Sequence, residues 1–156
     1  TTEIYTLSLH DALPISPCQI SVEEYVENQQ EGLIDHFWVP LPASNFFYSL
    51  QRHTRSANDL ALINVAVGMQ LEKGALLHPT VAVGGVAAHV RRLKEVEKAL
   101  EGISVNEYCR ETVEKKVQQN VSPIDDLRGS ASFKRHLAGV LVANAVEECI
   151  QKGERP

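Results

Sequence analysis

Hydrophobic and polar residues alternate most regularly in INVAVGMQL, residues 63–71. A period of two puts alternate side chains on opposite faces of a β-strand, so this segment predicts a strand with one hydrophobic face. EKGA, residues 72–75, predicts a turn, and the run that follows predicts an antiparallel return strand with Pro79 at an edge or a bulge. The residues of the predicted hydrophobic face are Ile63, Val65, Val67, Met69 and Leu71.

Two more extended segments precede this hairpin. NFFYSLQ predicts a strand because Phe46, Tyr48 and Leu50 fall on one face. GLIDHFWVPLP, residues 32–42, contains another predicted strand over 33–39, which the prolines after it end. With the hairpin, NFFYSLQ completes a predicted three-stranded antiparallel sheet.

Beyond the sheet, hydrophobic residues recur at helical spacing and predict a helix over 89–101 that ends at Gly102. Ser104 and Glu107 have the spacing of a capping box, in which the serine and glutamate side chains satisfy backbone N–H groups at a helix start. A second helix is therefore predicted over 105–119.

A third helix is predicted after a cap near Ser130. Its hydrophobic residues cover most of the helix circumference, which is typical of a central buried helix. The sequence thus predicts an α+β domain over 43–152: a three-stranded antiparallel sheet followed by a three-helix bundle. The hydrophobic residues of the third helix are Phe133, Leu137, Val140, Leu141, Val142, Val146 and Ile150.

Composition narrows the class of protein. The formal net charge is −5, and basic residues form no run longer than pairs such as Arg91 and Arg92, which argues against nucleic acid as a partner. No apolar run is long enough to cross a bilayer. The three cysteines lie far apart without a CxxC pair, as expected for reduced cytoplasmic thiols.

The first fifteen residues, TTEIYTLSLHDALPI, resemble the translation of a widely used sequencing adapter. The segment is not a secretory signal, because no basic residue precedes its apolar part. We expect residues 1–16 to be adapter-derived or disordered, and the natural sequence to begin near Ser16 or Pro17 without its own start.

Candidate chemistry is sparse. The histidines do not have the spacing of metal ligands, and VAVGG lacks the further glycines or lysine of a phosphate loop, so we expect no catalytic residue and no metal site. The polar loop QRHTRSAND, residues 51–59, is the exception. It can hold an anion or meet a partner, or it can be a solvated hairpin loop in which Asn58 and Asp59 form the turn.

Three segments in order carry a family resemblance: RSANDLALINVAVGMQLE, VAVGGVAAHVRRLKEVEKALEG and SPIDDLRGSASFKRHLAGVLVANAVEE. They resemble the C-terminal domain of the FAD-binding (medium) subunit of molybdenum hydroxylases, of the xanthine dehydrogenase and carbon monoxide dehydrogenase type. The resemblance runs from about Leu33 to Glu148. It implies that residues 17–42 are the end of a truncated flavin-binding domain, 43–152 the C-terminal domain, and 153–156 a tail.

The resemblance also implies a function and partners. In such enzymes a molybdopterin subunit hydroxylates the substrate, and electrons pass through [2Fe-2S] clusters of an iron–sulfur subunit to FAD and on to an acceptor. The glycine-rich loops that hold most of the flavin have no counterpart here, so we expect this chain alone to be inactive. The substrate, the acceptor and the oligomeric state stay open.

Four residues are the cofactor-binding candidates that the resemblance implies. A family contact in the last strand of the flavin domain falls on Ile34. A lysine that is common in the family falls on Gln51 when residues are counted back from NDLA, and on Ser49 when the count starts from FFYSL. A positive charge near the flavin would then come from Arg52 or Arg55. The alternative function is a non-catalytic protein-interaction module whose helices and polar loop bind a partner.

Overall fold

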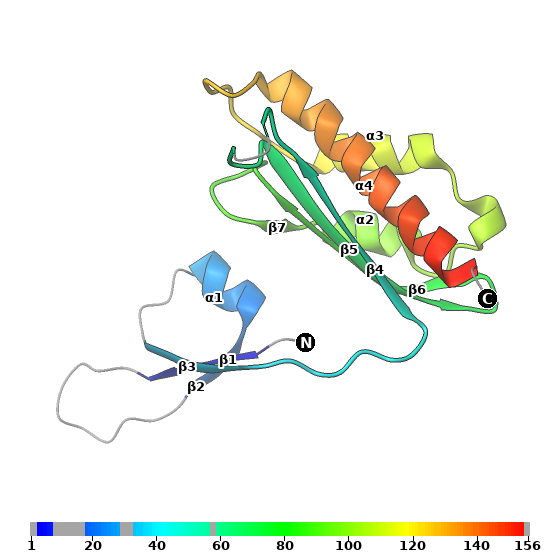
Figure 1. Cartoon of the computed structure of the whole chain (residues 1–156), viewed down its shortest axis with the longest axis horizontal. Coiled ribbons are helices and arrows are strands. Elements are labelled where there is room, and N and C mark those ends of the chain that lie inside the picture. The colour runs from blue at the N-terminus through cyan, green and yellow to red at the C-terminus, as the bar shows by residue number, and fades with distance from the viewer. Residues whose placement is uncertain (1–2, 8–17, 29–32, 57–58, 155–156) are drawn as a thin grey trace. The chain divides into compact units, whose positions relative to one another are not determined.

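The structure, a computed structural model, describes residues 3–7, 18–28, 33–56 and 59–154, with the backbone alone for 3–7 and Cys18. The chain divides into an amino-terminal unit, Thr1–Pro42, and a carboxyl-terminal unit, Ala43–Pro156 (Figure 1). Each unit is described by itself.

The amino-terminal unit is a three-stranded antiparallel sheet with one helix. Its strands β1 (Glu3–Leu7), β2 (Cys18–Ser21) and β3 (Leu33–Trp38) lie in the order β2-β1-β3. Part of the segment that resembles a translated adapter therefore forms β1, and the rest of it lies outside the described residues.

Helix α1 (Val22–Asn28) occupies a stretch where the sequence analysis predicted no helix. Ser21 and Glu24 form a capping box at its start: the Glu24 N–H donates to Ser21 Oγ at 3.1 Å, and the Ser21 N–H donates to Glu24 Oε2 at 3.3 Å. This S-x-x-E signal was present in the sequence and was missed.

The sheet of the carboxyl-terminal unit has four strands, not the predicted three. They are β4 (Phe46–His53), β5 (Ile63–Glu72), β6 (Ala75–Gly84) and β7 (Arg91–Arg92), antiparallel in the order β4-β5-β6-β7. The residues of β7 were predicted to lie in the helix over 89–101, since two residues are too few to show the two-residue period of a strand. Pairing with β6 decides their conformation instead.

The β5–β6 hairpin has the predicted turn and the predicted bulge. Lys73 (φ 52°) and Gly74 (φ 77°) both have positive φ, as a two-residue type I′ turn requires. The register shifts between Gly68 and Gln70 on β5, opposite His78 and Pro79 on β6. Because proline has no N–H for the ladder, the bulge lies where Pro79 would otherwise interrupt the pairing.

Three α-helices cover one face of this sheet: α2 (Lys94–Leu100), α3 (Arg110–Asn120) and α4 (Ala131–Glu154) (Figure 1). The α+β class is confirmed, but two helix starts were wrong. Helix α2 begins at Lys94 because the preceding residues belong to β7.

The predicted second helix is interrupted. Val105–Glu107 form a short 3₁₀ helix, η1, and Ser104 makes no side-chain cap there, so the predicted capping box is wrong. Ser104 instead forms a β-bridge with Ala75. The chain then bends, and Tyr108 Oη donates to the Ala143 carbonyl of α4 at 3.3 Å before α3 begins.

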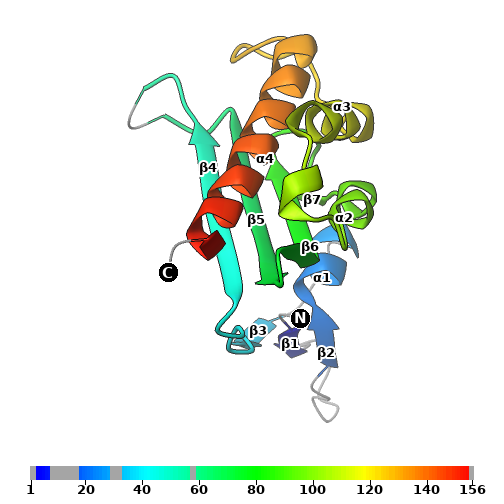
Figure 2. The same ribbon diagram turned by 90° about the vertical axis from the view of Figure 1, so that its right-hand side faces the viewer.

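Helix α4 is the centre of the core, as its hydrophobic pattern predicts. It packs against β4, β5 and α3, while α2 packs on β6 (Figure 2). The predicted face of β5 is buried against it, except that Leu71 is only partly buried. Two of its predicted core residues are not fully buried: Phe133 is 45% exposed near the first turn, and Val140 is half-buried. Ser130 caps the helix through its Oγ, which accepts the Phe133 N–H at 3.3 Å.

Candidate functional site

Strand β4 carries two of the four candidate residues, Gln51 and Arg52, and also Ser49, and it has two different faces. Ser49 is 1% exposed and, with Gln51, lies on the face toward α4. Tyr48 and Leu50 lie on the opposite face and are 60% and 71% exposed, and by alternation Arg52 shares their face. Ser49 and Gln51, the two alternative positions of the family lysine, therefore face the interior, and Arg52 faces outward.

Both interior residues bind one carboxylate. Ser49 Oγ donates to Glu148 Oε2 at 2.6 Å, and Gln51 Nε2 donates to the same oxygen at 2.7 Å. Lys152 Nζ forms an ion pair with Glu148 Oε1 at 2.7 Å and also donates to the Tyr48 carbonyl at 2.8 Å. We call Ser49, Gln51, Glu148 and Lys152 the β4–α4 polar cluster.

The electrostatics of this cluster favour its charged form. The hydrogen bond from Lys152, and after it the one from Ser49, lower the pKa of Glu148 below its ordinary value. The same contact with Glu148 raises the pKa of Lys152. Both groups thus stay charged near neutral pH, and neither is suited to exchange protons in general acid–base catalysis.

The polar loop beyond β4 is tied together by Asp59. Arg52 donates from a terminal guanidinium nitrogen to the Asp59 carbonyl at 2.5 Å, and Arg55 Nε lies 3.4 Å from Asp59 Oδ2. Asp59 Oδ1 also accepts the N–H of Leu60 at 2.8 Å. Asn58, the other predicted turn residue, lies outside the described residues.

Ile34, the remaining candidate, lies in the amino-terminal unit. It is half-buried on β3, opposite Thr6 of β1. The structure therefore brings Gln51 together with Ser49, and Arg52 with Arg55, while Ile34 belongs to the other unit.

The described residues do not fit a complete FAD site. Two surface cavities, of about 430 and 310 Å³, are lined by other residues, and neither includes Ile34, Gln51, Arg52 or Arg55. The amide of Gln51 is already bound inside the domain. In the part of the chain that the structure describes, no three metal-binding side chains gather, and no helix is long and apolar enough to cross a bilayer.

Sequence analysis missed Glu148 and Lys152, which complete the polar cluster. Their i, i+4 spacing on a helix was a visible signal for an ion pair, but it is common on solvated helix surfaces. Nothing in the sequence places them beside Ser49 and Gln51, nearly a hundred residues earlier.

Comparison with known proteins gives one family. Residues 48–149 match the family described as CO dehydrogenase flavoprotein C-terminal domain. YgfM of Escherichia coli K12, which is named as uncharacterized, is 32% identical over 136 residues, which are 86% of this chain and 47% of YgfM. The glyceraldehyde dehydrogenase medium chain of Sulfolobus acidocaldarius is 33% identical over 94 residues, which are 60% of this chain and 34% of that protein. This chain thus spans about half or less of the length of these relatives.

Solved structures share the fold. Quinoline 2-oxidoreductase from Pseudomonas putida 86 matches with a TM-score of 0.80 and 16% identity, over 99% of this chain and 54% of that chain. Carbon monoxide dehydrogenase from Hydrogenophaga pseudoflava matches with a TM-score of 0.79 and 21% identity, over 96% and 53%. At these identities the likeness shows the fold alone.

Proposed function

This chain belongs to the family of the CO dehydrogenase flavoprotein C-terminal domain, and from that premise we propose that it is part of a FAD-containing electron-transfer subunit of a molybdenum hydroxylase. In this proposal the subunit passes electrons from the clusters of an iron–sulfur subunit through FAD to an acceptor. A molybdopterin subunit carries out the hydroxylation, in the manner of xanthine dehydrogenase, in the cytoplasm.

The observation that carries the proposal is the extent of the family match. It covers nearly the whole carboxyl-terminal unit, from the third residue of β4 to the last turns of α4. The names of several relatives support the assembly, because they are called a medium chain or a medium subunit.

We propose that this chain forms a rigid support beside the flavin and does not bind the flavin's phosphates. The β4–α4 polar cluster fixes β4 on the core helix, so the outward face of the strand has a defined position. Ile34, Gln51, Arg52 and Arg55 remain the candidates for contact with the flavin. For Gln51 this contact would require its amide to leave Glu148.

A flavin titration tests the proposal. Purified chain is added to FAD, and flavin fluorescence is followed. We expect no saturable change, because neither of the two cavities described above includes a candidate flavin residue. The same chain is then joined to the preceding part of the carbon monoxide dehydrogenase medium chain of Afipia carboxidovorans, and this chimera should bind FAD.

Two results would count against the proposal. Tight binding of one FAD by the chain alone would mean that the cofactor site has been misplaced. A folded chimera that binds no FAD would mean that the carboxyl-terminal unit does not support a flavin site. Circular dichroism of both proteins separates loss of binding from loss of folding.

A further inference from the structure

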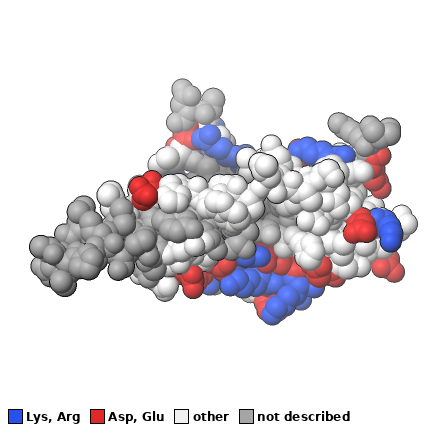
Figure 3. Space-filling model, turned by 90° about the horizontal axis from the view of Figure 1, so that it is seen from below, with Lys and Arg blue, Asp and Glu red and all other residues white. Residues whose placement is uncertain are grey.

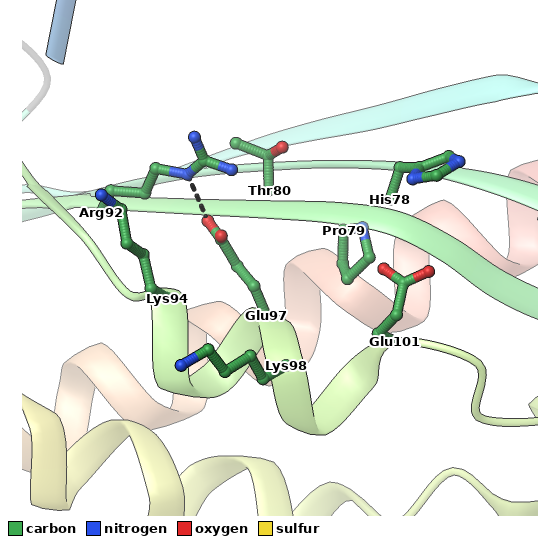
Figure 4. A pocket seen from close by; sticks show the side chains of 8 residues that line it. All are labelled: His78, Pro79, Thr80, Arg92, Lys94, Glu97, Lys98 and Glu101. Carbon is green, nitrogen blue, oxygen red and sulfur yellow. Dashed lines mark hydrogen bonds and ion pairs between the residues drawn. The ribbon is translucent and has the colours of Figure 1, made fainter.

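The two outer edges of the sheet in the carboxyl-terminal unit differ. The edge of β6 that faces away from β5 is closed by several different contacts. Leu76 is hydrogen-bonded through its N–H and its carbonyl to the loop after α2, and Pro79 has no N–H to present. The Val81 N–H donates to Glu97 Oε1 at 2.8 Å, and Figure 4 shows Arg92 bound to the same carboxylate beside the strand. Strand β7 then pairs with the end of β6.

Strand β4 forms the opposite edge, and no described strand pairs with its outer side. The carbonyls of Asn45 and His53, at its two ends, accept N–H groups from the β5 side. Because backbone groups alternate in direction along an antiparallel strand, the even-numbered residues of β4 point their N–H and C=O groups away from β5. Tyr48, Leu50 and Arg52 therefore have their backbone groups at this edge and exposed side chains on the face that the helices leave uncovered. Such an edge is a template for the addition of another strand.

Lys152 reaches this edge from the last turns of α4. Its Nζ donates to the Tyr48 carbonyl at 2.8 Å and lies 5.5 Å from the centre of the Tyr48 ring. The ion pair with Glu148 Oε1 at 2.7 Å holds the ammonium there, and the Lys152 side chain is 41% exposed. A strand added to β4 would have to bury or displace this charge, which is unfavourable because an ammonium group is strongly hydrated.

Apart from Lys152, the strand is suited to pair with its own copy. In an antiparallel pair centred on Leu50, this residue lies opposite Leu50 of the second copy, and Tyr48 lies opposite Arg52 of the second copy. Apolar pairs and arginine–aromatic pairs stabilise neighbouring strands. The next strand adds no charge beside them, because Gly68 and Ala66 of β5 are the partners of Tyr48 and Leu50. Figure 3 shows a broad area without charged side chains on one side of the molecule.

We propose that Lys152 protects the edge of the sheet and keeps β4 from pairing with β4 of a second copy. Natural proteins protect exposed edge strands in this way, with lysine among the residues they use. The opposite edge needs no such charge, because the loop after α2, the carboxylate of Glu97 and β7 already close it.

Sedimentation velocity of the purified chain over a wide range of protein concentration tests the proposal. Two neutral variants, Lys152→Met and Lys152→Gln, remove the charge, and Lys152→Arg retains it. Both neutral variants should fold, because an exposed ion pair adds little to stability, and far-UV circular dichroism checks this. The control is Lys115→Met, which removes one charge at an exposed position of α3.

Hydrogen exchange followed by mass spectrometry shows where the copies meet. Pairing at the edge would slow the exchange of the outward N–H groups in the peptide that covers β4, whereas loosening of the domain would speed it. A second change, Leu50→Lys in the Lys152→Met background, places a charge on the edge strand again. It should reverse association only if the copies meet through β4.

We expect both neutral variants to self-associate with a dissociation constant at least about tenfold lower than that of the unmodified chain, because no ammonium then has to lose its water. Exchange in β4 should slow as they associate. Lys152→Arg and Lys115→Met should behave like the unmodified chain, and Leu50→Lys should restore its behaviour. The proposal is overturned if the neutral variants associate no more than the unmodified chain or than Lys115→Met. It is also overturned if their association leaves exchange in β4 unchanged or survives Leu50→Lys.

This assay contains no flavin and no other subunit, so its outcome is independent of the proposed function. Edge protection by Lys152 would stand even if the chimera failed to bind FAD. Binding of FAD by the chimera would equally stand if Lys152 proved to have no effect on self-association.

Discussion

Replacing Glu148 with alanine should loosen the attachment of β4 to α4. The carboxylate accepts hydrogen bonds from Ser49 and Gln51 and pairs with Lys152. Only Ser49 is fully buried among these partners, so it alone loses its acceptor without access to water. A matched pair of variants, Glu148→Ala and Glu148→Gln, separates the lost hydrogen bonds from the lost charge.

The size of the effect follows from the exposure of each partner. A buried hydroxyl that loses its acceptor costs about 1 to 3 kcal/mol. The ion pair is worth only about 0.2 to 1 kcal/mol, because its side chains are 38% and 41% exposed. Glu148→Ala should therefore destabilise the unit by about 2 to 3 kcal/mol. Glu148→Gln keeps an acceptor for Ser49 and should cost about 1 kcal/mol.

Urea unfolding followed by far-UV circular dichroism measures this difference. Tryptophan fluorescence is unsuitable, since the single tryptophan, Trp38, lies in the amino-terminal unit. The midpoint for Glu148→Ala should fall by roughly 1 to 2 M urea. His136→Ala is the control because His136 is exposed on the same helix, and it should change stability by less than about 0.5 kcal/mol.

The effect of pH on the Glu148→Gln variant has a definite sign. The pKa of Glu148 is lowered in the folded chain, so the charge contributes stability above the ordinary glutamate pKa. That contribution is lost as the pH falls from the ordinary value through the lowered one. The difference in the free energy of unfolding between the unmodified chain and Glu148→Gln should be largest at neutral pH and smaller in acid. The reasoning is refuted if Glu148→Ala costs no more than His136→Ala.

Other changes have equally specific outcomes. Leu141→Asp places an unpaired charge in the core and should abolish the helical circular dichroism signal, at a cost above about 4 kcal/mol, whereas Leu127→Asp at a fully exposed position should not. Gly85→Ala should lower the thermal midpoint, by at least about 1 to 2 kcal/mol of stability, because φ is 86° there and the new Cβ would collide with a backbone carbonyl; an unchanged midpoint would contradict the backbone assignment. In a Cys18→Ser background near about pH 8, iodoacetamide should modify the exposed Cys109, whose pKa is lowered by a hydrogen bond with Thr112. Cys149 should react only on unfolding, since burial raises its pKa to about 11, and peptide mass spectrometry of the native protein distinguishes the two sites.

The periodic elements could be predicted from the sequence because the core selects their pattern directly. Strand β5 alternates because one face packs on α4, and α4 is apolar around most of its circumference because β4, β5 and α3 surround it. Short elements without periodicity could not be found in this way. Strand β7 depends on hydrogen bonds to β6, and η1 depends on the bridge between Ser104 and Ala75.

The candidate site, too, could be predicted only in part from the sequence. The sequence alone determined the α+β class, the core helix and a family resemblance that points to four candidate residues. Only the tertiary structure decided that Ser49 and Gln51 face a carboxylate from α4. Buried hydrophobic residues recur with the period of each helix or strand, so their positions can be predicted from the sequence. A contact between side chains distant in the chain depends on how those elements pack, which no local pattern specifies.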